Sequence, residues 1–176
     1  DPNPVVMFEH KGIYWSKVPG TEGAKSIEPS KDYIIPLGKA RIHLQTSEEH
    51  LENGETLSII TYGMGVWWAT AAAKNFEGQI EIIDLRTLSP CDDEAIYDSV
   101  KRHGKVIVLT EETINNSFAQ ALAGRIQEHC FQSLDAPVKC IGSLDVPAVP
   151  LNVDLEKEML PNAEKVDRAI SDLLHY

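Results

Sequence analysis

The stretch "IITYGMGVWWATAAAKNF", residues 59–76, indicates which fold the rest of the chain is expected to follow. It opens on the end of a β-branched apolar run, passes through two glycines separated by one residue, and continues into an alanine-rich segment. A continuous apolar run is typical of a strand that is buried on both faces of a sheet. The stretch therefore predicts a strand, a tight turn and a helix, which is the repeating unit of α/β proteins.

The sequence from Ile35 onward repeats this alternation. Strands are predicted at residues 40–45, 56–62, 79–85, 105–112 and 136–142, and helices at residues 65–76, 91–103, 116–131 and 163–176. Such alternation indicates a parallel sheet that helices cover on both faces. We expect a three-layer α/β/α sandwich with a mostly parallel sheet of about five strands. The apolar runs "LSIITY", "IEIID", "VIVLT" and "VKCI" should be its interior strands, and the more polar "ARIHL" should lie at an edge.

The sequence before Ile35 lacks this regular pattern. Residues 4–9, "PVVMFE", predict a short strand, whereas residues 16–34 hold several glycine and proline breaks with mixed charge and predict a linker. The chain begins at Asp1 instead of methionine, within sequence of structured character. We interpret it as a fragment or a processed piece of a longer protein.

Composition excludes several classes of function. The formal net charge of −11 repels phosphate backbones, so we expect no nucleic-acid partner. Every apolar run falls short of the roughly 20 residues that cross a bilayer, so we expect no membrane partner. The three cysteines, Cys91, Cys130 and Cys140, are odd in number and scattered, which favours a reducing compartment over a disulfide framework.

The two glycines in the opening stretch raise the question of a nucleotide site. Gly63 and Gly65 lie between a strand and a helix, and Asp84 ends the next strand about 20 residues on, where dinucleotide folds place the carboxylate that binds a ribose. The third glycine of that motif would stand at the position of Trp68, which is too large for a close approach of helix and strand. We therefore interpret the glycines as a tight turn, with a nucleotide site as the alternative.

Other candidate groups lack the spacing that chemistry requires. His129 and Cys130 are adjacent on a predicted helix, so their side chains point about 100° apart and form no nucleophile and base pair. Glu111 and Glu112 end a strand, where α/β sites are built, but adjacent strand positions face opposite ways. The six histidines form no metal-binding motif. The residues alone predict no catalytic, cofactor-binding or metal site.

Four segments in the same order resemble one enzyme family. They are "DPNPVVMFEHKGIYW", "YIIPLGKARI", "IEIIDLRTLSPCDDEAIYDSV" and "CFQSLDAPVKCIGSLDVPAVP". Together they are similar to the C-terminal half of the β-subunit of thiamine-diphosphate-dependent 2-oxoacid dehydrogenases, the E1 components of pyruvate and branched-chain complexes. The resemblance implies the transketolase C-terminal domain fold over residues 35–176. Residues 1–15 would then be the tail of the preceding pyrimidine-binding domain, and residues 16–34 a linker.

The resemblance also implies a function in assembly. The whole E1 enzyme oxidatively decarboxylates a 2-oxoacid and transfers the acyl group to the lipoyl group of E2. The family's catalytic glutamate and histidine precede this segment, so thiamine diphosphate and Mg would be bound by the full enzyme and not by this fragment. Implied partners are the E1 α part and a second β copy, in a dimer or heterotetramer. The implied location is the bacterial cytoplasm or the mitochondrial matrix. The alternatives are a transketolase-like enzyme and a stand-alone α/β module that binds a protein or a nucleotide.

Two residues are singled out by position in that family. The C-terminal domain of E1 β carries the surface that docks the subunit-binding domain of the E2 acyltransferase, which is typically basic. Asp135, which precedes Ala136 and Pro137, and the last residue, Tyr176 with its carboxylate, are the implied contacts. An acidic chain suits such a partner.

Overall fold

The computed structural model describes residues 2–6, 8–15 and 18–176, and the chain divides into two compact units, Asp1–Ile34 and Ile35–Tyr176. The first unit contains α1 (Lys11–Tyr14) and the 3₁₀ helix η1 (Glu22–Ala24). The strand predicted at residues 4–9 is wrong, because none of the described residues there is in a strand, and Met7 lies outside them. Val5 and Phe8 are exposed, and the described part of this unit offers no neighbouring strand for ladder hydrogen bonds. The assignments of residues 1–15 and 16–34 to a preceding domain and a linker stay predictions.

The second unit is built on one five-stranded sheet. Its strands are β1 (Arg41–Leu44), β2 (Leu57–Thr61), β3 (Ile80–Asp84), β4 (Val106–Thr113) and β5 (Lys139–Ser143). Their order across the sheet is β1-β3-β2-β4-β5. The four later strands run parallel, and β1 pairs antiparallel with β3. The predicted α/β class with a mostly parallel sheet is confirmed.

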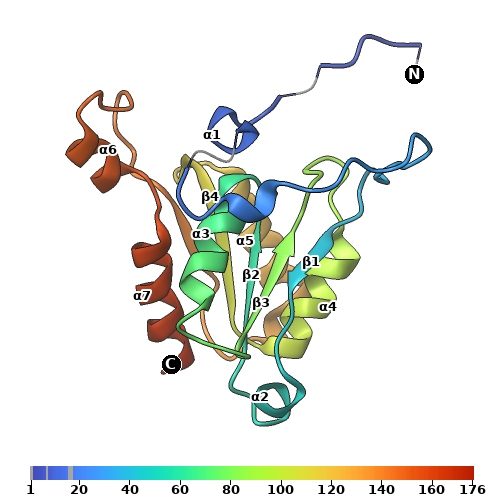
Figure 1. Ribbon diagram of the computed structural model, residues 1–176. Coiled ribbons are helices and arrows are strands. Elements are labelled where there is room, and N and C mark those ends of the chain that lie inside the picture. The colour runs from blue at the N-terminus through green and yellow to red at the C-terminus, as the bar shows by residue number, and fades with distance from the viewer. Residues whose placement is uncertain (1, 7, 16–17) are drawn as a thin grey trace. The chain divides into compact units, whose positions relative to one another are not determined.

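Helices cover both faces of this sheet (Figure 1). They are α2 (Glu48–Glu52), α3 (Met64–Ala73), α4 (Asp93–His103), α5 (Phe118–Cys130), the 3₁₀ helix η2 (Phe131–Ser133), α6 (Val153–Met159) and α7 (Ala163–Leu174). Helices α3 and α7 pack together on one face, and α4 and α5 pack on the other. The four predicted helices are confirmed to within a few residues, whereas the short helices α2 and α6 were not predicted.

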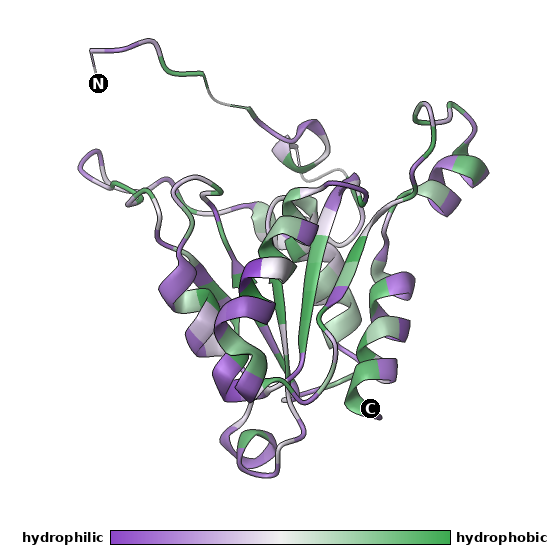
Figure 2. Cartoon of the chain, turned by 180° about the vertical axis from the view of Figure 1, so that it is seen from behind, coloured by the Kyte–Doolittle hydropathy of each residue, from purple (hydrophilic) through white to green (hydrophobic). Residues whose placement is uncertain are grey.

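Two apolar cores lie on either side of the sheet, and alternate residues of each central strand supply them. In β2, Ile59 faces the core under α3 and α7, and Ile60 faces the core under α4 and α5; both side chains are fully buried. Ile82 and Ile83 of β3 divide in the same way. Figure 2 shows the central strands as a hydrophobic layer between helices whose outer faces are hydrophilic.

The two edges of the sheet differ from the prediction in one respect. The strand "ARIHL" lies at an edge as predicted, and "VIVLT" lies inside the sheet, between β2 and β5. The prediction that "VKCI" is an interior strand is wrong, because β5 ends the strand order. Pro137 lacks an N–H group and Lys139 is exposed, and both are features of an edge strand that keep other strands from pairing with it.

Replacing Gly65 with alanine is expected to destabilise the domain. A Cβ at Gly65 would collide with Thr61 Oγ1, which donates a hydrogen bond to the Leu109 carbonyl at 2.9 Å. Forcing this buried contact apart should lower the free energy of unfolding by about 1–3 kcal/mol in a urea titration. Gly124→Ala is the control, because nothing lies within 4 Å of its Cβ position and helical alanine should stabilise by up to ~1 kcal/mol. Equal stability of Gly65→Ala and the parent would contradict the close approach.

Candidate functional site

The carboxyl ends of the parallel strands are the first place to look for a site. The chain reverses its direction of winding between β2 and β4, and open α/β sheets bind ligands in the crevice at such a point. Here the protein's own side chains fill that position. Glu112 Oε1 accepts a hydrogen bond from the Phe118 backbone N–H at 2.8 Å, at the amino end of α5. The Tyr62 hydroxyl lies 2.7 Å from Thr110 Oγ1 and 3.4 Å from the same Glu112 oxygen.

This arrangement leaves the anion-binding end of α5 occupied from within. A helix amino terminus attracts negative charge, and the Glu112 carboxylate supplies it. Burial raises the pKa of Tyr62, and the charge of Glu112 beside it raises that pKa further, while the Thr110 hydroxyl opposes the shift. The Tyr62 ring also packs edge-on against the Phe118 ring, with 6.0 Å between centroids. These contacts hold the strand ends together and present no pair of acid and base aimed at a ligand.

The glycine turn has the geometry of a strand-to-helix connection. Gly63 has φ 57° and ψ −129°, which glycine adopts without strain, and Gly65 lies against Thr61. Trp68 is half-buried and packs against the apolar core under α3 and α7. Asp84 accepts a hydrogen bond from the Arg86 backbone N–H at 3.2 Å. Burial raises the pKa of Asp84 despite this bond and the positive charges nearby. The interpretation as a tight turn accounts for each of these residues.

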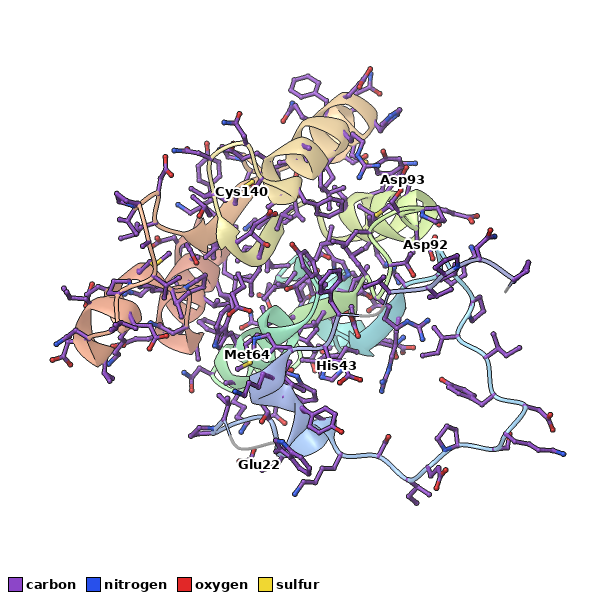
Figure 3. All side chains as sticks on the ribbon, turned by 90° about the horizontal axis from the view of Figure 1, so that it is seen from above. Glu22, His43, Met64, Asp92, Asp93 and Cys140 are labelled. Carbon is purple, nitrogen blue, oxygen red and sulfur yellow. The ribbon has the colours of Figure 1, made fainter. Side chains whose placement is uncertain are left out.

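The acidic residues that begin α4 are engaged in structural contacts. Figure 3 shows Asp92 and Asp93 side by side at the amino end of this helix. Asp92 Oδ1 accepts from the Ala95 backbone N–H at 3.4 Å, and its Oδ2 accepts from the Ala40 N–H at 2.9 Å, which ties the helix to the segment before β1. Asp93 pairs with Arg125 of α5 at 2.7 Å. Among the described residues, no group of three or more His, Cys, Asp or Glu side chains is placed to hold a metal ion.

The adjacent pair on α5 separates as the helical geometry predicts. Cys130 is buried in the core under α4 and α5, while His129 is exposed and its ring lies against that of Tyr97, with 4.8 Å between centroids. Burial raises the pKa of the Cys130 thiol, which keeps it protonated and poorly nucleophilic. In the described part of the chain, no helix is long and apolar enough to cross a bilayer.

The two residues singled out for partner binding, Asp135 and Tyr176, meet at the amino-terminal edge of the sheet. They are far apart in the sequence, yet both line one surface hollow of about 290 Å³. Its other lining residues are Gln127, Phe131, Leu134, Ala136 and Pro137. A second hollow of about 240 Å³ shares Pro137 and Tyr176 and extends along α7 past Asp172. We call the surface formed by Phe131, Asp135, Pro137, Asp172 and Tyr176 the α7-end surface.

Local contacts fix both residues on this surface. The Asp135 backbone N–H donates to the Gly104 carbonyl at 2.8 Å, just after α4 ends, and a Cβ at Gly104 would collide with the Asp135 carboxylate. The Lys105 ammonium donates to the Leu174 carbonyl at 3.1 Å, which attaches the end of α7 to the start of β4. Tyr176 follows directly and is 73% exposed. The chain therefore presents an acid and an aromatic ring on a fixed base.

An exposed aromatic side chain on the same surface was not predicted from the sequence. Phe131 is 68% exposed at the start of η2 and lines the hollow with Asp135 and Tyr176. Large aromatic side chains are usually buried, and exposed ones beside a hollow are typical of contact surfaces. The helical pattern of α5 had placed Phe131 at the end of an amphipathic helix. The change from α-helix to 3₁₀ turn at Cys130 is what directs this ring to the surface.

A buried polar cluster lies under α4, at the same end of the sheet. Glu81 of β3 is 2% exposed, and its Oε1 accepts a hydrogen bond from Ser99 Oγ at 2.6 Å. Ser58 Oγ of β2 lies 2.7 Å from the same Ser99 oxygen. The cluster thus joins two central strands to the helix above them, through groups that have left water.

A buried histidine completes this cluster. His103 Nδ1 lies 2.8 Å from Thr56 Oγ1, and its Nε2 lies 3.2 Å from Glu81 Oε1. The Nε2 contact lacks the geometry of a directed hydrogen bond, so we treat it as an electrostatic contact at short range. Arg102 Nη2 lies 3.6 Å from the same carboxylate oxygen. Burial would raise the pKa of Glu81, but the contacts from His103, Ser99 and Arg102 outweigh burial and lower it.

Comparison with known proteins identifies the family. The model of the family described as "Transketolase, C-terminal domain" matches residues 47–166, which is more than half of the chain. The chain belongs to this family. The match covers the sheet from α2 to the middle of α7, including the α4 cluster and Asp135.

Curated relatives of this transketolase C-terminal domain are β-subunits of 2-oxoacid dehydrogenases. It is 35% identical to the 2-oxoisovalerate dehydrogenase subunit beta of Bacillus subtilis, over 100% of this chain and 50% of that protein. It is 35% identical to the pyruvate dehydrogenase E1 component subunit beta of Rhizobium meliloti, over 97% of this chain and 34% of that protein. A third relative, at 33% identity over 96% of this chain and 46% of that protein, is the acetoin:2,6-dichlorophenolindophenol oxidoreductase subunit beta of Cupriavidus necator. The chain spans half or less of the length of these relatives.

A solved structure supports the fold. The domain superposes on a protein named "Split gene transketolase, inactive beta4 tetramer" with a TM-score of 0.64 and 21% identity, covering 83% of this chain and 45% of that one. Homology to E1 β-subunits and the transketolase C-terminal fold, both predicted from the four sequence segments, are confirmed.

Proposed function

We propose that this chain is the C-terminal assembly domain of the E1 component of a 2-oxoacid dehydrogenase complex, and that its α7-end surface docks the subunit-binding domain of the E2 acyltransferase. The whole E1 enzyme would oxidatively decarboxylate a 2-oxoacid and pass the acyl group to lipoyl-E2. Relatives named for 2-oxoisovalerate and for pyruvate match at the same 35% identity, so the proposal names the class of acid. The E1 α part and a second β copy are the further partners that we propose.

One observation carries the docking proposal. Asp135 and Tyr176 were selected by their position in the family, and the fold places them on one hollow although they are far apart in the sequence. The neighbouring Phe131 and Pro137 add apolar area, and Asp172 adds a second acid. An apolar centre rimmed by charge is the usual anatomy of a protein–protein contact, and acidic rim residues favour a basic partner.

The residues of this chain do not fit the diphosphate and metal of thiamine diphosphate. The crevice at the strand ends is filled by Tyr62 and Glu112, and the carboxylate of Glu112 lies where an anion would bind α5. A negatively charged diphosphate would meet that carboxylate directly. We therefore derive no catalytic step for this chain and propose that the cofactor and Mg are held by the remainder of the enzyme.

We expect two changes on the α7-end surface to weaken docking. Asp135→Asn removes one rim charge, and deletion of Tyr176 removes a ring that is 73% exposed. Each should raise the dissociation constant for the E2 subunit-binding domain about 3- to 30-fold, because a rim charge or an exposed ring contributes roughly 1–2 kcal/mol to such contacts. Isothermal titration calorimetry of the purified chain with that domain measures this directly.

A matched control separates local contact from net charge. Glu52→Gln removes one negative charge from the exposed end of α2, away from the lining residues of both hollows. It should leave the dissociation constant within about twofold of the parent. If both α7-end variants bind like the parent, or if Glu52→Gln weakens binding as much as Asp135→Asn, the docking surface lies elsewhere.

A further inference from the structure

A segment between β5 and α7 exposes an unusual density of apolar side chains. We call residues 144–158 the apolar arm; it consists of a loop and α6, and Figures 1 and 2 show α6 standing apart from the sheet. Met159, at the carboxyl end of α6, is the buried residue of this helix. Six large apolar residues of the arm are exposed: Leu144, Val146, Val149, Leu151, Val153 and Leu155.

Polar contacts hold the arm at both ends, so its exposure is a built feature of the fold. At its start, Asp145 Oδ2 accepts a hydrogen bond from Asn115 Nδ2 at 2.6 Å. The Leu144 N–H donates to the Met159 carbonyl at 3.1 Å, which closes the base of the arm. At its end, the Lys165 ammonium donates to the Lys157, Glu158 and Leu160 carbonyls at 3.2, 2.5 and 2.7 Å, which caps α6.

The loop itself is restricted in conformation. Pro147 and Pro150 fix two backbone torsions, and the Asn152 side chain caps α6 by accepting hydrogen bonds from two backbone N–H groups. A surface that is already ordered loses less entropy when it binds a partner. Leu151, at the outer end of the loop, is fully exposed and therefore contributes nothing to the packing of this domain.

Charge decides which partner the arm suits. The whole chain carries a net charge of −11, so two copies repel each other over most of their surface. Residues 144–153 contain one charged residue, Asp145, and Asn115 already bonds it. The arm is thus the part of the surface on which two acidic copies approach with the least repulsion. An uncharged apolar segment can also face its own copy across a twofold axis, because apolar contact requires no charge complementarity.

We propose that the apolar arm is the contact surface for a second copy of this chain, formed by the arms of two copies packing against each other. The inference rests on the proposed role of a second β copy as a partner and names the residues that would bind it. Val149, Leu151 and Val153 are its centre, because they stand farthest from the anchored ends in the sequence. The surface is separate from the α7-end surface.

Leu151→Asp tests this contact without disturbing the fold, because the parent side chain is fully exposed. Sedimentation equilibrium of the parent chain should give a dimer or larger species with a dissociation constant of about 100 µM or tighter. Leu151→Asp should weaken association at least about tenfold, because it places two like charges in an apolar contact. Phe131→Asp, a substitution at an equally prominent apolar residue on the α7-end surface, should leave association unchanged.

Each alternative outcome is distinguishable. A parent chain that is monomeric at about 100 µM, or a Leu151→Asp variant that associates like the parent, overturns the assignment of the arm. Dissociation by Phe131→Asp instead would place the self-contact on the α7-end surface. Protection of the arm by the E1 α part, with the parent chain monomeric, would identify a different occupant and overturn the inference as well. Leu151→Asp should still dock the E2 subunit-binding domain, so loss of docking by the parent would overturn the proposed function without affecting this one.

Discussion

Replacing Glu81 with alanine is expected to lower the free energy of unfolding by roughly 3–5 kcal/mol, which is a large part of the stability of a domain of this size. The side chain is 2% exposed, and its carboxylate contacts His103, Ser99 and Arg102 at 3.2, 2.6 and 3.6 Å. Its removal would leave the His103 ring buried beside a cavity and without its negative neighbour. Chemical denaturation monitored by circular dichroism measures the loss.

A glutamate at the surface provides the matched control. Glu94, on α4, is 80% exposed and lies 3.7 Å from Lys39. Because exposed ion pairs contribute little, Glu94→Ala should cost less than about 1 kcal/mol. Equal effects of the two substitutions would mean that the Glu81 cluster does not hold α4 to the sheet.

The same cluster gives the domain a defined acid sensitivity. The pKa of Glu81 is lower in the folded protein than in the unfolded chain, because the contacts from His103, Ser99 and Arg102 outweigh burial. Its contribution to stability is therefore fully present above the ordinary glutamate pKa of about 4.3 and is lost as the pH falls through the lower folded value. Glu81→Gln should remove this part of the acid-induced loss of stability. An unchanged slope of stability against pH below about pH 4.3 would contradict the assignment.

The second large effect concerns catalysis. We expect the purified 176-residue chain neither to bind thiamine diphosphate in the presence of Mg nor to decarboxylate pyruvate or branched-chain 2-oxoacids. The family's catalytic glutamate and histidine precede this segment, and the Glu112 carboxylate occupies the anion-binding end of α5. Supplying the preceding half of the β-subunit and the E1 α part should restore activity from an undetectable level. Saturable cofactor binding to the chain alone, at micromolar concentration in a calorimetric titration, would refute this expectation.

The central strands could be predicted because their burial on both faces demands apolar side chains at every position. β2, β3 and β4 appear in the sequence as runs without alternation, and so their place inside the sheet follows directly. β5 has the same apolar character at Cys140 and Ile141, and it was predicted wrongly. Its Pro137 and Lys139 were the signal of an edge, and the strand order also depends on helix packing that a local pattern does not contain.

The polar cluster had a signal in the sequence that was not used. Glu81 stands inside the apolar run "QIEIIDL", and a carboxylate at an inward position requires a partner. That partner, His103, ends a helix that follows the strand, and its distance from Glu81 is set by how α4 lies on the sheet. Short helices such as α2 and α6 also escaped prediction, because five or seven residues are too few to establish a helical period.

The docking residues came from family position and not from physical pattern. Asp135 and Tyr176 have nothing in their local sequence that brings them together, and their meeting on one hollow depends on the contact between Lys105 and the end of α7. The exposure of Phe131 likewise follows from the 3₁₀ turn after α5. Exposure of this kind is a property of the assembled surface, and the hydrophobic pattern of a helix does not encode it.

Titration of the E2 acyltransferase subunit-binding domain into this chain, at low and at high salt, tests the central claim most directly. The account predicts saturable binding at about 50 mM salt that weakens severalfold or more at about 500 mM, because acidic rim groups attract a basic partner and salt screens them. Absence of binding at low salt, or an affinity that does not change with salt, would contradict it.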